Sequence, residues 1–325
     1  MTEMLILPVS SPLRAEFAIS RGAKTHADTI RVELHDGNHI GRGECVPYPR
    51  YGESRDSVIA QLAGMVSAIE AGLSRDRLQT AMPAGAARCA LDCALWDLQA
   101  KQTGIPVWQR AGLSKPRALD TTMTISLAAP DIMAQAAKQA DAKLLKLKCG
   151  SPEDMARLEA IRQARPDAEL ILDGNEGMDP HTFPDICAQA ERLDVAMIEQ
   201  PFPQGQDEAL RKRPGRIRIC ADESVHTRQD IQRLARTYDA VNIKLDKAGG
   251  LTEALAMIQE ARRCGLATMV GCMVAGSLSM APAVLLGCSA DIADLDGPLW
   301  LQDDIGHKLR YADGSVFPPE TALWG

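Results

Sequence analysis

Several features that would mark particular protein classes are missing from this 325-residue sequence. Aromatic residues make up only 4% of it, and none of its 36 lysines and arginines form a basic run interleaved with aromatics. The formal net charge is −7. Because nucleic-acid binding depends on clustered positive charge, we expect no nucleic-acid partner.

The nine cysteines include no CxxC pair. Cys89 and Cys93 are four residues apart, which on a helix favours two small buried residues over a metal pair. An odd number of cysteines without paired motifs in a long chain indicates a reducing, cytoplasmic compartment. The N-terminus lacks a basic segment followed by a long apolar run, so no secretory signal peptide is expected.

One uncharged stretch, residues 267–290, is long enough to resemble a membrane span. It contains Gly271, Gly276 and Pro282, has no basic flank at its C-terminal end, and is not accompanied by a second candidate span. We therefore expect a buried strand, a loop and a buried helix in this stretch, and no membrane partner.

What is present is typical of a soluble globular protein, with 46% apolar and 24% charged residues. Residues 1–115 predict an α+β domain. Its expected elements are strands at 4–10, 28–35 and 38–44, a hairpin turn at Asp36-Gly37, and helices at about 54–70 and 86–101. We expect the tail, about 305–325, to return to this domain and complete it.

Residues 116–304 alternate between strand-like and helical patterns. The expected strands are 121–127, 143–148, 169–173, 195–199, 216–222, 239–244, 266–271 and 291–296. Ser151 and Pro152, followed by acidic residues, predict the start of one of the helices between them. Eight such units predict a parallel (β/α) barrel.

Five of these strands end in a charged residue, at intervals of 25, 26, 23 and 22 residues. These residues are Lys148, Asp173, Glu199, Asp222 and Lys244. A residue that closes a parallel strand lies at the C-terminal mouth of the barrel, where barrel active sites form. A lone acid there can be a helix cap and a lone lysine a solvated charge, but five in register predict one shared cavity.

Three carboxylates and two lysines suggest a particular chemistry. Oxygen ligands favour Mg²⁺, and no histidine stands at these strand ends to favour Zn²⁺. Lys146 lies on the same face as Lys148, and we expect their mutual repulsion and burial to lower their pKa values. A metal between two opposed lysines suits proton removal from a carbon next to a carboxylate. Nearby, Asn175 either orients a ligand or makes a turn, and Glu223 is a candidate for supporting the metal ligands.

These motifs resemble those of the enolase superfamily, in its muconate lactonizing enzyme subgroup, over essentially the whole chain. The matching motifs are Lys146-x-Lys148, Asp173-x-Asn175, Glu199-Gln200-Pro201, Asp222-Glu223-Ser224 and Asn242-Ile243-Lys244-Leu245-Asp246-Lys247. The resemblance implies a modified (β/α)7β TIM-type barrel with an N-terminal α+β capping domain. It also implies one Mg²⁺ per subunit, with Asp173, Glu199 and Asp222 as its ligands. Lys148 and Lys244 are then the two acid/base residues, and Lys146 supports Lys148.

Motifs in the last strand and in the capping domain resemble those of one group of enzymes within this subgroup. Asp294-x-Asp296 is similar to the motif with which dipeptide epimerases of this subgroup bind the free α-ammonium group of the substrate. Segments 19–22 and 45–54 resemble the specificity loops of L-Ala-D/L-Glu epimerases. This resemblance implies Arg21 as the residue that binds the glutamate side-chain carboxylate, with Lys24 or Arg50 as alternatives. Thr124 is a further predicted substrate-binding residue.

The activity implied is Mg²⁺-dependent epimerization of L-Ala-D/L-Glu dipeptides. It proceeds by two-base 1,1-proton transfer through an enediolate, and the family implies a role in murein peptide recycling. Other scaffold-compatible activities stay open, namely epimerization of other dipeptides, N-acylamino acid racemization, cycloisomerization and o-succinylbenzoate synthesis. A metal-stabilised binding protein without turnover is a further alternative, but it would not account for the two lysines. A Schiff-base aldolase would not account for the three carboxylates. The sequence does not determine the dipeptide range or the oligomeric state, although such barrels commonly form homo-oligomers.

Overall fold

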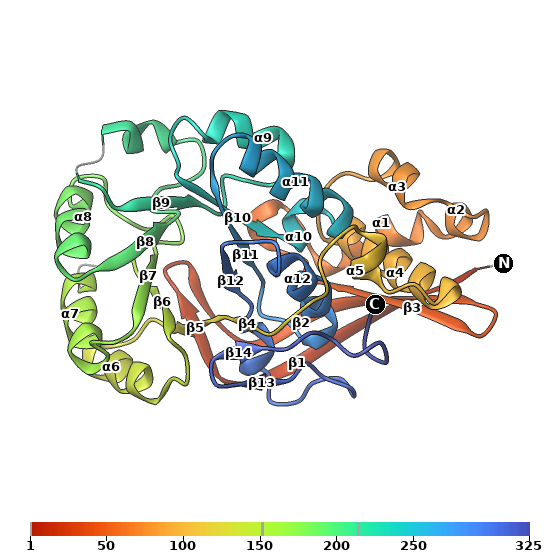
Figure 1. Ribbon diagram of the computed structural model, residues 1–325, viewed down its shortest axis with the longest axis horizontal. Coiled ribbons are helices and arrows are strands. Elements are labelled where there is room, and N and C mark those ends of the chain that lie inside the picture. Colours follow the sequence, from red (N-terminus) through yellow and green to blue (C-terminus); the bar gives the residue numbers. More distant parts are fainter. Residues whose placement is uncertain (1, 151–152, 213–214) are drawn as a thin grey trace.

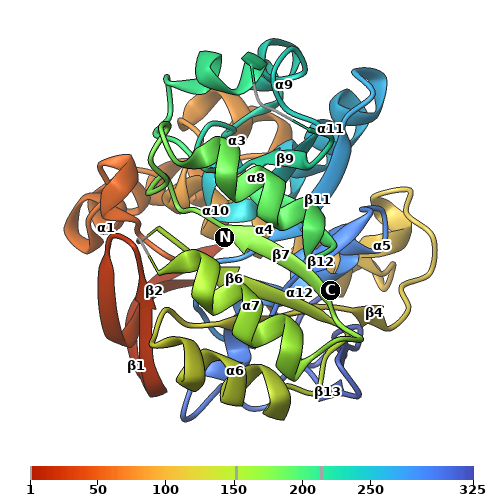
Figure 2. The same cartoon turned by 90° about the vertical axis from the view of Figure 1, so that its left-hand side faces the viewer.

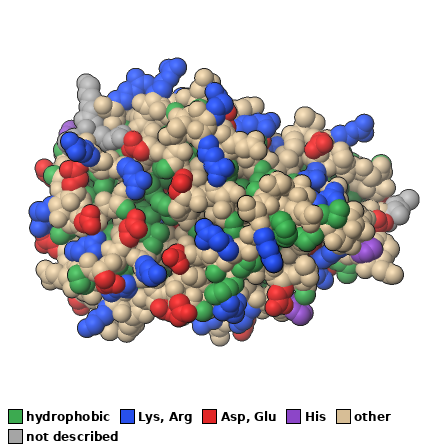
Figure 3. Space-filling model, in the orientation of Figure 1, with side chains coloured by type: hydrophobic (Ala, Val, Ile, Leu, Met, Phe, Trp, Pro, Cys, Tyr) green, Lys and Arg blue, Asp and Glu red, His purple; other side chains and the backbone are tan. Residues whose placement is uncertain are grey.

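The computed structural model describes residues 2–150, 153–212 and 215–325. In it, an antiparallel sheet with its helices lies beside a parallel barrel, and helices α6, α7 and α8 line the outer face of the barrel (Figures 1 and 2). The predicted helix start at Ser151-Pro152 lies outside the described residues. On the face seen in Figure 3, acidic and basic side chains intermingle.

The N-terminal sheet has the strand order β1-β2-β3 and is antiparallel. Its strands are β1 (Glu3–Ile19), β2 (Gly22–Asp36) and β3 (His39–Cys45). β1 is much longer than the predicted strand at 4–10, because it continues beyond Pro12 with a shift of register before Phe17. Proline is tolerated there since β1 is an edge strand of the sheet. The long β1–β2 hairpin carries its turn, Ser20-Arg21, to the mouth of the barrel.

Helices of 3 to 18 residues follow the sheet. They are η1 (Pro49–Tyr51), α1 (Arg55–Ala63), α2 (Val66–Glu70), α3 (Arg75–Ala81), α4 (Ala86–Thr103) and α5 (Val107–Arg110). The single helix predicted at 54–70 is wrong, because α1 ends at Ala63 with Gly64 as its C-cap, and α2 begins at Val66. α4, which agrees with the prediction at 86–101, is buried along most of its length, Cys89 and Cys93 included. It approaches β3 so closely that a Cβ at Gly41 or Gly43 would collide with its backbone.

The eight parallel strands of the barrel confirm the predicted alternation. They are β5 (Thr122–Ile125), β6 (Leu144–Lys148), β7 (Glu169–Asp173), β8 (Val195–Glu199), β9 (Arg218–Ala221), β10 (Ala240–Lys244), β11 (Ala267–Gly271) and β12 (Ile292–Asp294). The helical elements between them are α6 (Pro130–Gln139), α7 (Asp154–Ala164), α8 (Phe183–Arg192), η2 (Asp207–Lys212), α9 (Arg228–Leu234), α10 (Leu245–Ala248), α11 (Leu251–Arg263) and α12 (Ser277–Gly287).

The barrel closes between its first and last strands through side chains. The strand order runs from β12 to β5, and the described residues form no ladder between these two ends. Instead, the Thr122 hydroxyl donates to Asp294, the Thr124 N–H donates to Asp296 Oδ2 at 2.7 Å, and the Leu295 N–H donates to Thr121 Oγ1 at 2.8 Å. The segment Asp294-x-Asp296 therefore forms this junction between β12 and β5, which we call the seam.

The uncharged stretch at 267–290 forms β11, a loop and α12, all largely buried, as predicted. No described helix is long and apolar enough to cross a membrane. After η3 (Gly297–Trp300), the tail forms β13 (Tyr311–Ala312) and β14 (Ser315–Val316), which pair with each other, and β14 also pairs with β4 (Leu119–Asp120). The buried Trp324 then donates its indole N–H to the Cys93 carbonyl of α4 at 3.1 Å. The domain boundary near residue 115 stays a prediction.

Candidate active site

The charged residues at the strand ends meet at one end of the barrel. Asp173 and Glu199 are the last residues of β7 and β8, and Asp222 directly follows β9. All three carboxylates are at most 1% exposed. Burial of three neighbouring anions is unfavourable unless cations compensate them. The lysines that pair with these carboxylates are therefore an essential part of the site.

Lys146 is the cation that these carboxylates share. Its Nζ lies 3.0 Å from Asp173 Oδ2, 2.8 Å from Glu199 Oε2 and 2.8 Å from Asp294 Oδ2. Burial alone would lower the pKa of Lys146, but these carboxylates outweigh it and hold the pKa well above its usual value. The expectation of a lowered pKa is wrong for Lys146, because the sequence pattern revealed the neighbouring lysine but not the anions around it.

Lys148 and Lys244 lie on opposite sides of the cluster. Their strands, β6 and β10, are four positions apart in an eight-stranded barrel. Lys148 Nζ lies 2.6 Å from Asp173 Oδ2, and Lys244 Nζ lies 2.6 Å from Asp222 Oδ2. Burial opposes the charge of Lys244, yet Asp222 keeps the pKa of Lys244 well above its ordinary value. Two amines therefore approach one cavity from two faces.

The donor set fits a hard divalent cation. Among the described residues, no three His, Cys, Asp or Glu side chains surround an open point as a ready metal site, since the Lys146 ammonium lies between the carboxylates. Of the three carboxylates, Glu199 is the least compensated, because only Lys146 lies against it, whereas two lysines contact Asp173 and two contact Asp222. Burial, reinforced by Asp173, raises the pKa of Glu199 to about 8, and Glu199 Oε2 has no well-aligned hydrogen bond. Carboxylate oxygens in need of a cation match the preference of Mg²⁺.

Asp294 and Asp296 both lie at the seam, and both are buried. Asp294 is bound by Lys146 and Thr122, whereas Asp296 accepts from the Thr124 N–H and, at 3.3 Å, from Trp300 Nε1. Burial raises the pKa of Asp296, and the charge of Asp294 adds to this effect. The predicted ammonium-binding pair and Thr124 are thus brought together with the lysine cluster.

Asn175 and Glu223 line the main cavity, which has a volume of about 590 Å³. Lys148, Asp222 and Lys244 line it too. Glu223 is 1% exposed, and its Oε2 atom has no hydrogen-bond partner among the described residues. Glu223 is therefore part of the cavity wall, and its support of the metal ligands stays a prediction.

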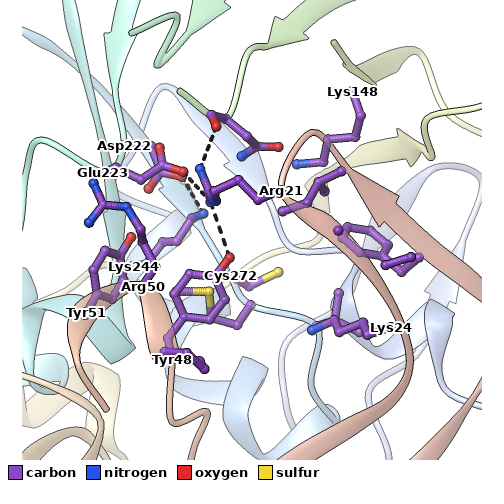
Figure 4. Close-up of a pocket in the computed structure, with 18 residues that line it drawn as sticks. Arg21, Lys24, Tyr48, Arg50, Tyr51, Lys148, Asp222, Glu223, Lys244 and Cys272 are labelled. Atoms are coloured by element: carbon purple, nitrogen blue, oxygen red, sulfur yellow. Dashed lines mark hydrogen bonds and ion pairs between the residues drawn. The ribbon is translucent and has the colours of Figure 1, made fainter. Parts of the chain in front are cut away.

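The three cations predicted as alternatives differ in what they contact (Figure 4). Arg21 Nη2 lies 2.8 Å from Glu223 Oε1, and its Nη1 donates to the Asn175 carbonyl at 2.6 Å. Arg50 is paired with Glu176 through two hydrogen bonds of 2.7 and 2.6 Å. Lys24 has no ion pair with any described carboxylate, and lies 5.8 Å from the centre of the Phe17 ring.

Lys24 lines the same cavity and is the least compensated of the three. Burial lowers the pKa of Lys24 to about 8. A partly buried amine without an ion pair suits an anionic group of a ligand in the same cavity.

Sequence reasoning missed several supporting residues. Lys247 Nζ lies 2.5 Å from Asp222 Oδ1, and Asn242 Nδ2 donates to Glu199 Oε1 at 2.9 Å. The Gln200 side-chain oxygen accepts the N–H groups of Asp222 and Ser224 at 2.8 and 3.1 Å. All three residues belong to motifs singled out above, but only the fold shows that they orient metal-ligand candidates.

Comparisons with known proteins agree with this architecture. Residues 1–112 match the family model of the mandelate racemase/muconate lactonizing enzyme N-terminal domain, and residues 131–322 match the enolase C-terminal domain-like model. The chain therefore belongs to the mandelate racemase/muconate lactonizing enzyme family of the enolase superfamily.

Within this family, the chain is similar to the L-Ala-D/L-Glu epimerase of Escherichia coli. The two are 45% identical over 94% of this chain and 96% of the relative. An N-acetyl-D-glutamate racemase of Pseudoalteromonas is 40% identical over 91% of this chain and 95% of the relative. An Agrobacterium tumefaciens enolase family member with homology to dipeptide epimerases, solved with sodium and L-Ala-L-Glu, is 46% identical, with a TM-score of 0.98 and complete coverage of both chains. An Enterococcus faecalis dipeptide epimerase, solved with Mg and L-Leu-L-Tyr, is 27% identical, with a TM-score of 0.91 over 98% of this chain and 97% of that one.

Proposed function

We propose that this protein is a Mg²⁺-dependent isomerase that interconverts L-Ala-L-Glu and L-Ala-D-Glu at the α-carbon of the glutamate. The observation that carries the proposal is the position of Lys148 and Lys244 across the barrel from each other, each beside a buried carboxylate. A two-base epimerization needs one group on each face of the α-carbon, because one removes the proton and the other returns a proton to the opposite face.

Asp173, Glu199 and Asp222 would hold the Mg²⁺. When bound, the cation neutralises the substrate α-carboxylate and makes the α-proton more acidic. Lys146 supplies positive charge to the same carboxylates and orients Asp173 and Glu199 through its contacts. Lys148 and Lys244 exchange protons with the α-carbon from opposite sides, and Asn242, Gln200 and Lys247 keep the carboxylates in place.

Lys24 is the residue that we propose for the glutamate side chain. Arg21 is already paired with Glu223, and Arg50 with Glu176. The charges of the two arginines are therefore balanced by carboxylates of the protein. Lys24 lines the cavity without such a partner among the described residues. A substrate carboxylate would restore the charge balance of Lys24. This assigns to Lys24 the role that the resemblance implies for Arg21.

Asp294 and Asp296 are the proposed site for the α-ammonium group of the alanine. A second candidate function is racemization of an N-acylated glutamate, which has no ammonium group. It is favoured by the fact that Lys146 and Thr122 already bind Asp294, and by the similarity to the N-acetyl-D-glutamate racemase. Asp296 has no cation partner among the described residues, and this favours the dipeptide.

A cytoplasmic role in the recycling of murein peptides follows as part of the proposal. The nine free cysteines, of which six are buried, suit a reducing compartment. L-Ala-D-Glu is the dipeptide unit that such a role would deliver to the enzyme.

The proposal is tested by NMR in D₂O. The purified protein is incubated with Mg²⁺ and either L-Ala-L-Glu or N-acetyl-glutamate, and the glutamate α-proton is followed. We expect exchange and formation of the other diastereomer with the dipeptide, both abolished by EDTA. Exchange with N-acetyl-glutamate alone would establish the second candidate, and exchange with neither would refute both.

A further inference from the structure

Glu176, in the loop after β7, joins two loops of the N-terminal domain to the barrel. Its side chain is only 6% exposed. It accepts two hydrogen bonds from Arg50 (2.7 and 2.6 Å), one from Arg21 Nη1 (3.2 Å) and one from the Gln204 N–H (2.8 Å). Arg21 belongs to the β1–β2 turn and Arg50 to η1, within the loop that follows β3, so a single carboxylate connects both loops to the barrel mouth.

The backbone around Glu176 is held in a conformation that non-glycine residues disfavour. Asn175 has φ of 41° and Glu176 has φ of 67°. The Glu176 N–H donates to the Gln200 carbonyl at 2.8 Å, and the Asn175 carbonyl accepts from Arg21 at 2.6 Å. A left-handed backbone persists when its surroundings fix it, and such positions cluster at functional sites. Here it directs the carboxylate toward the two arginines.

The hairpin turn fits closely against the barrel at the same point. A Cβ added to Gly150 or Gly177 would lie 2.8 or 2.9 Å from the Ser20 Cβ, so these two glycines leave the room that Ser20 occupies. The Ser20 hydroxyl also donates to the Asn175 carbonyl at 3.2 Å. The closed position of the hairpin thus depends on close packing and on the ion pairs of Glu176.

We infer that Glu176 is a positioning residue that holds both loops closed over the cavity and thereby sets substrate affinity. Glu176 does not line the cavity, whereas Arg21, Arg50 and Lys24 do. If the loops open, apparent affinity falls in proportion to the closed fraction, while the chemistry within the closed state is unchanged. The inference rests on the proposed function insofar as the bound ligand is a dipeptide.

Glu176→Gln tests the inference, since it keeps the side-chain size and removes the charge. We expect KM for L-Ala-L-Glu to rise about tenfold and kcat to change less than twofold. Without substrate, amide hydrogen exchange of residues 16–24 should become several-fold faster. Glu159→Gln is the matched control, because it breaks a 2.6 Å pair with Arg192 remote from the cavity and should change neither quantity.

Arg50→Gln separates the ion pair from a general loss of structure. Alone it should raise KM as Glu176→Gln does, and the double variant should exceed the larger single effect only slightly, because both changes remove the same pair. Unchanged KM and unchanged exchange in Glu176→Gln would overturn the inference. A loss of kcat at constant KM, or a higher KM without faster exchange, would overturn it too. If wild-type protein turns over no dipeptide while hydrogen exchange still responds to Glu176→Gln, the closure stands and the proposed function fails.

Discussion

The ammonium group of Lys146 lies 2.8 Å from Oδ2 of Asp294, which joins the second strand of the barrel to the last. The same ammonium group contacts two of the proposed metal ligands. One buried cation is therefore shared between the proposed metal site and the proposed ammonium site, so a change at one of them affects the other.

Asp294→Asn should weaken binding of substrates that carry a free ammonium group. We expect KM for L-Ala-L-Glu to rise by about 10- to 100-fold, because a hydrogen bond between charged groups contributes roughly 1.5–3 kcal/mol. Steady-state kinetics with L-Ala-L-Glu and N-acetyl-glutamate measure the effect. Asp303→Asn, at an exposed position of the tail, is the control. Equal losses for both substrates would mean that Asp294 serves Lys146 and not the ammonium group.

Replacement of Lys148 or Lys244 should strongly lower the epimerization rate. It should still leave exchange of the α-proton in one of the two diastereomers. Lys148→Ala and Lys244→Ala should each lower the epimerization rate by about 10²- to 10⁴-fold, the usual contribution of a positioned acid or base. Each variant should still exchange the α-proton of one diastereomer, and the two variants should differ in which one. NMR in D₂O with each diastereomer separately measures this. If both variants exchanged the α-proton of the same diastereomer, the two-base assignment would be contradicted.

Removal of the metal should lower both activity and stability. Mg²⁺ that binds only the folded protein adds about 2.7 kcal/mol to the free energy of unfolding at a concentration of one hundred times its Kd. Thermal unfolding with EDTA and with Mg²⁺ should show this difference in wild-type protein, but a much smaller one in Glu199→Gln. Glu169→Gln, an exposed position on β7, should behave like wild type. An unchanged Mg²⁺ response in Glu199→Gln would remove Glu199 from the ligand set.

The affinity for L-Ala-L-Glu should fall above about pH 8. Burial lowers the pKa of Lys24 to about 8, so Lys24 is charged below that pH and loses its attraction for a carboxylate above it. The substrate α-amino group titrates in the same range, near 8. Lys24→Arg isolates the contribution of the enzyme, because arginine stays charged, and its kcat/KM should fall less steeply than that of wild type. Superimposable pH profiles would exclude Lys24.

Lys24→Met gives a second check on the side-chain site. It should raise KM about 10- to 100-fold for L-Ala-L-Glu and leave KM for L-Ala-L-Leu nearly unchanged, because only the former carries a side-chain carboxylate. Equal effects on the two dipeptides would contradict the assignment.

Asp246 should make the protein less stable as pH rises. Burial raises the pKa of Asp246 to about 7, and Glu53 and Glu44 add to this effect, against a 2.8 Å hydrogen bond from the Val46 N–H. Since the folded pKa exceeds the unfolded value near 3.9, this stabilising contribution is complete below about pH 4 and is lost as pH rises through about 7. Asp246→Asn should remove this slope and stabilise the protein at pH 8 by up to about 4 kcal/mol. Denaturant unfolding at pH 5 and pH 8 measures it, and a slope unchanged in the variant would contradict it.

Local sequence determined the barrel and the positions of its reactive groups. Segments 169–173 and 195–199 are strands with the predicted bounds, because apolar runs of strand length between helical patterns are typical of buried parallel strands in α/β folds. The spacing of Asp173, Glu199 and Asp222 then places them at one mouth without further information. The pattern failed after Ser10, where it predicted the end of a strand, whereas the strand continues past Pro12 because it lies at the edge of the sheet.

Tertiary structure alone decided which charges neutralise one another. Lys146 meets Asp294, 148 residues away, and Arg21 meets Glu223, 202 residues away. These pairs depend on how the barrel closes and where the hairpin rests, which local patterns do not encode. The physical reason is that buried charges are governed by the ions within a few ångströms of them, and in this protein those ions come from distant parts of the chain. The same sequence motifs therefore predicted the reaction type, while the role of Lys24 became visible only when the partners of Arg21 and Arg50 were known.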